Sequence, residues 1–154
     1  MRHAAVPVPN LFSFLRGSWR LRRTLVDRRA GATLVVLGTA AWLADAPSAG
    51  PPLLLYYSET GELQRAGAPP TPTRAAARWI AVAGAPAAAR VEFEDGRPFH
   101  DVDLATGCCA AAHDCAPDSY AGTLTAGEDT LTIFWRVTGP AKDYDSTTLL
   151  TREG

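Results

Sequence analysis

The most constraining feature of this chain is a succession of short apolar or alternating runs that begins at Trp19 and continues to Thr151. Turn-forming pairs such as Asp95-Gly96 and Gly139-Pro140 separate these runs at fairly even intervals. Short runs with period-two alternation indicate β-strands, and the residues between them are typical of tight turns. We therefore expect nine or ten short antiparallel strands that follow one another in chain order.

Four places in this pattern carry specific predictions. Gly38 lies in the long run Ala32–Ala44 and is expected to mark a bend or a β-bulge. Thr60-Gly61 is expected to turn the chain, and Asp95-Gly96 predicts a two-residue hairpin turn. The alanine-rich stretch Thr73–Val82 competes as a helix, because alanine favours helices, but the surrounding pattern favours a strand.

One short helix is expected before the strands. Asn10 is a suitable N-cap for Leu11–Leu15, and Gly17 is expected to end this helix. Residues 1–9 are interpreted as a flexible N-terminal segment. Because 154 residues is the size of one domain, residues 10–154 are expected to form a single β-barrel domain.

The sequence Gly17-Ser18-Trp19 stands where the helix gives way to the first strand, and Arg152 lies in the last strand. A tryptophan that closes one end of a small barrel needs a cation or polar group over its exposed ring face. We therefore predict that Gly17, Trp19 and Arg152 together close one end of a barrel. Closure of the sheet would also remove the exposed edges that an open sheet leaves.

A Gly-x-Trp sequence after a short helix, a strand meander of this length and an arginine in the final strand together resemble the calycin superfamily of lipocalins and fatty-acid-binding proteins. Three longer blocks resemble an uncharacterised family of small lipocalin-like proteins. The resemblance implies an all-β, closed, antiparallel up-and-down barrel of eight to ten strands with an internal cavity. It implies no activity and no catalytic residue. The adjacent pair Cys108 and Cys109 departs from it. The three blocks are Phe93–Leu104, His113–Gly122 and Trp135–Tyr144.

Composition narrows the classes of partner. Fifteen basic and sixteen acidic residues give a formal net charge of -1, so the basic surface of a general nucleic-acid binder is missing. Three cysteines, two of them adjacent, fit a reducing compartment better than a disulfide framework. No run approaches the roughly 18 to 20 apolar residues that span a bilayer, and the amino end has no secretory h-region. We expect a soluble, cytoplasmic protein without a membrane partner, while the arginine-rich amino end leaves organellar import open.

Strand parity separates inward from outward side chains. His100 shares a face with Val102 and Leu104 and is expected to point into the barrel. Arg23 interrupts the apolar face of the first strand in the same way. Further polar side chains are expected on inner faces or at the barrel mouth, and these are His113, Tyr120, Lys142 and Tyr144.

These six polar residues lead to two interpretations that the sequence leaves open. In the first, they hold the polar end of a small hydrophobic or amphiphilic ligand, such as a carboxylate, while tryptophan, leucine and valine contact its apolar body. In the second, they form a satisfied internal network that fixes strand register, since an unpaired buried polar group costs about 1–3 kcal/mol.

Other chemistries receive less support from the sequence. Cys108, Cys109, His113 and Cys115 offer soft metal ligands, but one extended strand cannot wrap around a tetrahedral ion. A haem held by a single histidine is a further alternative. There is no Gly-x-Ser-x-Gly sequence. We assign no catalytic residue, metal or cofactor and predict a ligand-binding barrel; the alternatives are an enzyme that uses His100 as general acid or base, and an accessory subunit whose barrel is filled by side chains.

Overall fold

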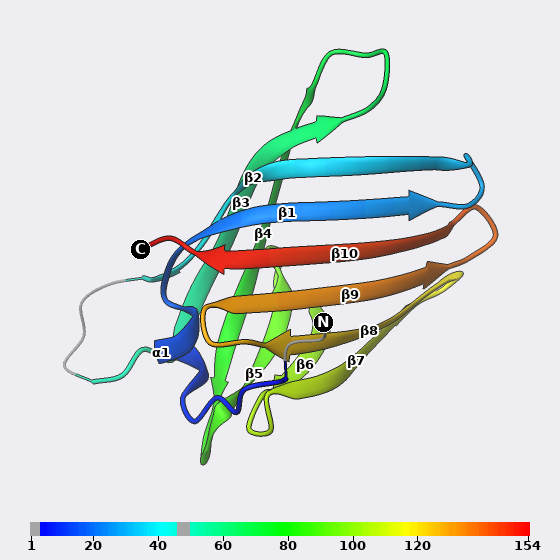
Figure 1. The fold of residues 1–154 in the computed structure, drawn as a ribbon. Coiled ribbons are helices and arrows are strands. Elements are labelled where there is room, and N and C mark those ends of the chain that lie inside the picture. Colours follow the sequence, from blue (N-terminus) through cyan, green and yellow to red (C-terminus); the bar gives the residue numbers. More distant parts are fainter. Residues whose placement is uncertain (1–3, 46–49) are drawn as a thin grey trace.

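A computed structural model describes residues 4–45 and 50–154 of the chain. One short helix precedes ten strands, as the alternation predicts (Figure 1). The elements are α1 (Leu11–Leu15), β1 (Gly17–Asp27), β2 (Ala32–Ala44), β3 (Leu54–Gln64), β4 (Thr71–Val82), β5 (Ala85–Phe93), β6 (Pro98–Asp103), β7 (Cys108–Cys115), β8 (Asp118–Ala126), β9 (Thr130–Thr138) and β10 (Asp143–Arg152).

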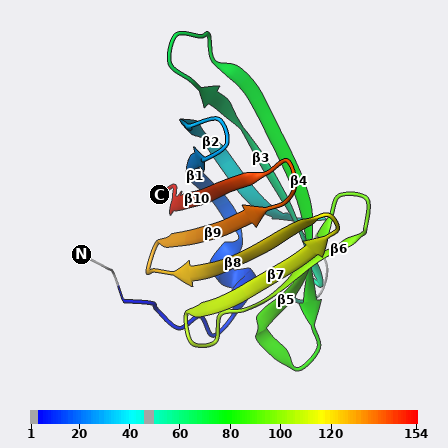
Figure 2. The same cartoon turned by 90° about the vertical axis from the view of Figure 1, so that its right-hand side faces the viewer.

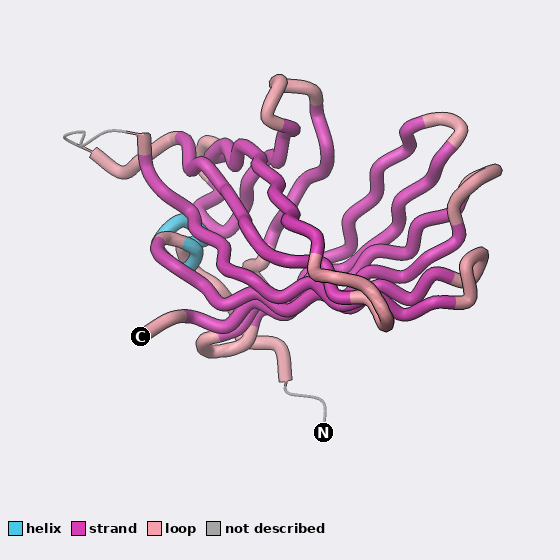
Figure 3. Tube along the Cα trace, turned by 90° about the horizontal axis from the view of Figure 1, so that it is seen from above, coloured by secondary structure: helices cyan, strands magenta, loops and turns pink. Residues whose placement is uncertain are grey.

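The ten strands form one antiparallel sheet in the order β6-β5-β4-β3-β2-β1-β10-β9-β8-β7. Neighbours in the sheet are neighbours in the chain, apart from β1 and β10, which pair along their length. The sheet curves around on itself, so the two edge strands β6 and β7 approach each other without forming a ladder (Figures 2 and 3). The expected all-β up-and-down barrel is confirmed, and it is closed except along the seam between β6 and β7.

The predicted turn at Thr60-Gly61 is wrong, because β3 runs through it without a break. Gly61 pairs directly with Gly38 of β2, and the register of β2 does not shift at Gly38. A β-bulge at Gly38 is therefore wrong, and the alternative, a bend, stays a prediction. A Cβ atom on Gly38 would lie 2.6 Å from the Gly61 Cα. These two glycines therefore allow two backbones to approach closely, rather than to turn.

The remaining local alternatives are also decided. Thr73–Val82 lies within β4, which pairs with strands on both sides, so the helix alternative is wrong. Asp95-Gly96 does turn the chain, and Gly96 has a φ of 89° there. The connection spans residues 94–97 rather than two residues, and the Phe93 amide donates to the Arg97 carbonyl across it at 2.9 Å.

Helix α1 packs against one end of the barrel, where Leu11 and Leu15 are fully buried. The predicted cap is confirmed, since the Ser13 amide donates to the Asn10 side chain at 3.0 Å. The Trp19 indole N–H donates to the Leu15 carbonyl at 2.8 Å and ties the helix to β1. The Arg152 guanidinium lies 4.3 Å from the centre of a Trp19 ring. Gly17 begins β1 with a φ of 114°, a conformation that favours glycine.

The segment before the helix also contacts this end of the barrel. The Val6 amide donates to the Ala126 carbonyl at 2.9 Å, and the Val8 amide donates to the Leu104 carbonyl at 3.0 Å. Val8 is buried. Within the segment 1–9, Val6 and Val8 are therefore hydrogen-bonded to the barrel, and residues 1–3 lie outside the described residues. Across the described part of the chain, no helix is long and apolar enough to cross a bilayer.

Replacing Trp19 by alanine tests how far barrel closure depends on this ring. Trp19 is 0% exposed and contacts α1, Trp42 and Arg152, so its loss leaves a cavity at the covered end. We expect the free energy of unfolding to fall by about 3–5 kcal/mol in urea titrations. Leu37→Ala is the matched control, because Leu37 is 44% exposed on β2, and we expect it to change stability by about 0.5 kcal/mol or less. Equal losses in the two variants would contradict the closing role of Trp19.

Candidate functional site

The first polar group inside the barrel is the Arg23 cluster, which consists of Arg23, Tyr57, Glu59 and Thr148. The two terminal nitrogens of Arg23 donate to the two Glu59 carboxylate oxygens at 2.8 and 2.9 Å. The Arg23 Nε atom donates to the Thr148 hydroxyl at 2.7 Å, and the Tyr57 hydroxyl donates to Glu59. Strands β1, β3 and β10 are thereby connected through side chains.

The electrostatics of the Arg23 cluster are balanced internally. Burial lowers the Arg23 pKa, but the hydrogen bonds and charge of Glu59 outweigh burial and raise it above its ordinary value. Burial, and then the charge of Glu59, raise the Tyr57 pKa. At neutral pH the cluster therefore holds one ion pair and a protonated tyrosine, and each of the three guanidinium nitrogens of Arg23 already donates a hydrogen bond.

The second group is the aromatic cluster, which lines the barrel beside the seam. Phe99 is stacked on Phe93 with ring centres 4.5 Å apart and on Trp135 with ring centres 5.3 Å apart. His100 lies 5.1 Å from Trp135, and His113 lies 5.2 Å from Phe99, again between ring centres. These five residues come from β5, β6, β7 and β9, and all are partly exposed.

His100 is held as a neutral ring within this cluster. Burial lowers its pKa, and the nearby His113 lowers it further, against the opposing effect of Asp101. The His100 Nδ1 atom lies 3.2 Å from the Asp101 carbonyl oxygen. A carbonyl oxygen only accepts, so Nδ1 carries the proton and Nε2 is left as an acceptor.

A third set of contacts extends the aromatic cluster toward the β9–β10 turn. Lys142 forms an ion pair with Asp118 at 2.9 Å and donates to the Tyr120 hydroxyl at 3.3 Å, and these two partners raise its pKa. The Tyr120 ring lies 5.8 Å from the His113 ring between centres. Burial, together with Tyr120, raises the Tyr144 pKa. The Lys142 charge is therefore compensated by Asp118.

The six polar residues predicted from the sequence thus divide into two places. His100, His113, Tyr120, Lys142 and Tyr144 form a continuous series of neighbours along β6, β7, β8 and the start of β10. Arg23 instead contacts Glu59, Tyr57 and Thr148.

Sequence reasoning missed several contributors, among them Glu59, Tyr57 and Phe99. Glu59 and Tyr57 escaped it because the predicted turn at Thr60-Gly61 interrupted the strand. The alternation Leu55, Tyr57, Glu59 was the signal that could have found them. Phe99 was missed because alternation places adjacent residues of a strand on opposite faces, and its neighbour His100 was predicted to face inward. A register shift between Val91 and Glu92 alters the alternation there, and no sequence signal marks this shift.

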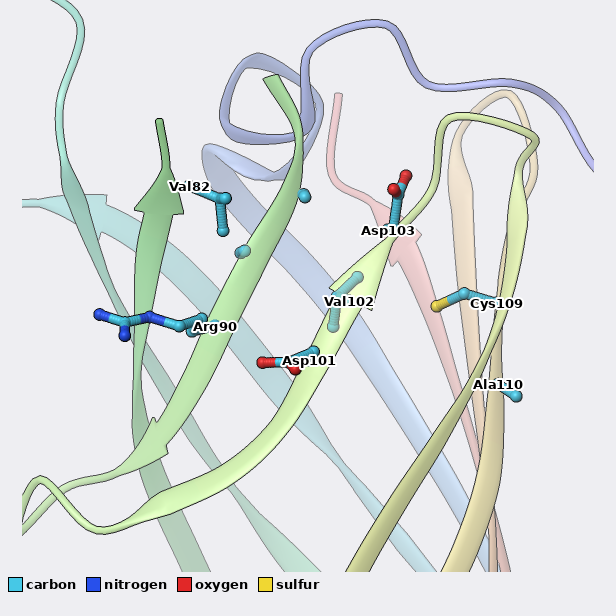
Figure 4. A pocket seen from close by; sticks show the side chains of 9 residues that line it. Val82, Arg90, Asp101, Val102, Asp103, Cys109 and Ala110 are labelled. Carbon is cyan, nitrogen blue, oxygen red and sulfur yellow. The ribbon is translucent and has the colours of Figure 1, made fainter. Parts of the chain in front are cut away.

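Two adjoining grooves lie along the seam, with volumes of about 390 Å³ and about 250 Å³. Both are lined by residues of β6 and β7, and they share Arg90 and Asp101. Figure 4 shows the larger one, where the Cys109 side chain points from β7 toward β6. Burial raises the Cys109 pKa. All three cysteines are free thiols, and within the described ranges no three His, Cys, Asp or Glu side chains are grouped to hold a metal ion.

Comparisons with known proteins give a family and a fold. The model of a family of unknown function, DUF6314, matches residues 15–152. A solved structure of an S-type phycobiliprotein lyase from Guillardia theta has a TM-score of 0.65 to this chain at 10% sequence identity. The likeness covers 97% of this chain and 94% of the lyase chain, and at this identity it shows the fold alone. A search of curated proteins finds no match.

The lowered pKa of His100 makes stability depend on pH. The unfolded chain takes up this proton near the ordinary value of 6.5, whereas the folded chain takes it up at a lower pH. Between these two values the unfolded state binds more protons, so the stability present above 6.5 is lost as the pH falls through this window. His100→Gln should flatten this part of the stability curve in urea titrations at a series of pH values. An unchanged slope would contradict the burial of a neutral His100.

The Arg23–Glu59 pair gives a double-mutant test. Arg23→Met leaves Glu59, which is 9% exposed, without its counter-charge. We expect a loss of about 3 kcal/mol, the lower end of the range for buried pairs, because the Arg23 side chain is 25% exposed. Adding Glu59→Gln should restore at least half of the loss. Strictly additive losses in urea titrations would show that the two side chains are not coupled.

Proposed function

This chain belongs to the DUF6314 family of unknown function, and we propose that its barrel binds a small amphiphilic molecule at the aromatic cluster. The observation that carries the proposal is the stack of Phe93, Phe99 and Trp135, whose rings are nearly parallel and only partly buried. Aromatic side chains in a core are usually covered, whereas these rings are only partly buried and lie beside the His100 and His113 rings. A flat apolar surface with a few polar groups is what a planar amphiphilic ligand requires.

Charge balance indicates what kind of polar end the ligand carries. Arg23 is paired with Glu59, Lys142 is paired with Asp118, and His100 is neutral at pH 7. A carboxylate would have to displace one of these pairs, which costs free energy. A neutral hydroxyl or carbonyl group would meet the imidazoles and the Tyr120 hydroxyl without that loss. We therefore place the polar end of a neutral ligand among His100, His113, Tyr120 and Tyr144.

The alternative is an enzyme that uses the same cluster, and one observation favours it. The Nδ1–H of His100 is oriented by the Asp101 carbonyl, so its Nε2 atom is free to act as a general base. Under this alternative His100→Gln abolishes a reaction while binding persists. Under the first proposal His100→Gln changes binding alone.

A fluorescent probe tests the binding proposal. N-phenyl-1-naphthylamine is neutral and amphiphilic, carries a flat naphthalene ring, and its emission rises when it leaves water. We expect the protein to bind it, and Phe99→Ala and Trp135→Ala each to weaken binding by about tenfold, since each removes a ring worth about 1.4 kcal/mol.

Leu37→Ala is again the matched control, because Leu37 is exposed on the outer face. Circular dichroism should first show that the ring variants keep the barrel. Native mass spectrometry of the gently purified protein should also show an added small mass. Probe binding that the two ring variants leave unchanged would overturn the aromatic cluster as the site.

A further inference from the structure

The seam leaves two strand edges without a partner. In the described sheet each strand from β1 to β5 and from β8 to β10 has a neighbour on both sides, whereas β6 pairs only with β5 and β7 pairs only with β8. The two edges diverge from the turn that joins them (Figure 2). An unpaired edge exposes a row of backbone donors and acceptors that can pair with another chain.

The two edges differ in how they are protected. Strand β6 begins with Pro98, which has no amide N–H, and carries the exposed carboxylates of Asp101 and Asp103. Residues 108–112 of β7 have none of these features, because Cys108, Ala110 and Ala112 are small and exposed. Proline, charge and bulges are the usual means of blocking an edge. The edge of β7 is therefore the one open to strand addition.

The grooves along the seam reach the edge of β7 over a few residues. The larger is lined by Cys109 and Ala110 of β7, and the smaller by Ala112 of the same strand. Because they share Arg90 and Asp101, they follow one another along β7. At about 3.3 Å per residue, this stretch matches a few residues of extended chain.

The side chains along these grooves carry an excess of negative charge. Glu92, Asp101 and Asp103 line one or other groove, against a single cation, Arg90. Asp101 lies at the point that both grooves share, and it is exposed. A second copy of this chain would bring the same acidic excess to the seam, so charge favours a different, basic partner.

We propose that the free edge of β7 binds an extended, basic segment of a partner protein by strand addition. The backbone of the segment pairs with β7, and an arginine or lysine side chain faces Asp101. Backbone hydrogen bonds supply affinity in this mode of recognition, and alternate side chains supply specificity. This interaction uses the backbone edge of β7, and the smaller groove beside it shares Phe99 and His100 with the proposed ligand site.

A synthetic peptide of alternating arginine and valine, about six residues long and blocked at both ends, is the probe. In an added strand every second residue directs its N–H and C=O toward the edge it joins. Methylation of alternate amide nitrogens therefore gives two isomers, of which one loses its edge-facing donors. With the full-length chain, we expect the unmethylated peptide to slow hydrogen exchange in β7, and only one methylated isomer to do the same.

Charge provides the second test. Asp101→Asn should weaken binding of the arginine peptide by about 2- to 5-fold, as expected for an exposed ion pair. Glu62→Gln is the matched control, since Glu62 is an exposed carboxylate on β3, three strands from the seam. A peptide with glutamate in place of arginine should not bind. Equal protection by both methylated isomers, or equal effects of the two charge variants, would overturn the proposal, as would edge-to-edge dimers seen by sedimentation.

Discussion

The pairing of β1 with β10 is the interaction on which the rest of the structure depends. Every other ladder joins strands that follow each other in the chain, whereas this one joins the two ends, from Trp19 opposite Arg152 to Asp27 opposite Tyr144. Once the first and last strands are paired, the two halves of the meander extend in opposite directions around the barrel. Their free edges, β6 and β7, face each other across the seam. The stacking of Arg152 on Trp19 stands at one end of this ladder.

The same ladder separates the polar groups of the interior. Arg23 lies opposite Thr148 in it, and Glu59 reaches the pair from β3, so this ion pair belongs to the wall built from the chain ends. The aromatic cluster belongs to the other wall, on β5, β6, β7 and β9. Because Lys142 is paired with Asp118 and the His100 ring is neutral, the inner side of the cluster carries no uncompensated positive charge. The sequence left two interpretations of the inner polar residues open, an internal hydrogen-bonded network and a ligand site. The contacts of the Arg23 cluster fit the network. The ligand proposal rests on the aromatic cluster.

Alternation and turn residues were enough to predict the fold class, the helix cap and the strand count, because these depend on local periodicity. They failed where glycine serves a contact between distant strands. Gly61 has the same sequence signature in a turn as beside Gly38, and only the β2–β3 register distinguishes the two. The partner of Arg23 was lost through that error. Phe99 was missed for a related reason. Alternation predicts which side chains face inward only while the hydrogen-bonded ladder is regular, and the ladder between β5 and β6 is not regular beside Phe99. Membership of the calycin superfamily remains a prediction, because the solved structure that resembles this chain shows the fold alone.

The open seam and the aromatic cluster have a common origin in β6. This strand has six residues, begins with a proline and loses register with β5 between Val91 and Glu92. Those features prevent a regular ladder from continuing to β7. They also bring the Phe99 ring against Phe93, His113 and Trp135, which a regular strand would not do for two consecutive residues such as Phe99 and His100. A change that restored the register between β5 and β6 and closed the seam would therefore also separate the rings of the aromatic cluster. Phe99 and His100 line the smaller groove as well, so the aromatic cluster and this groove share two side chains.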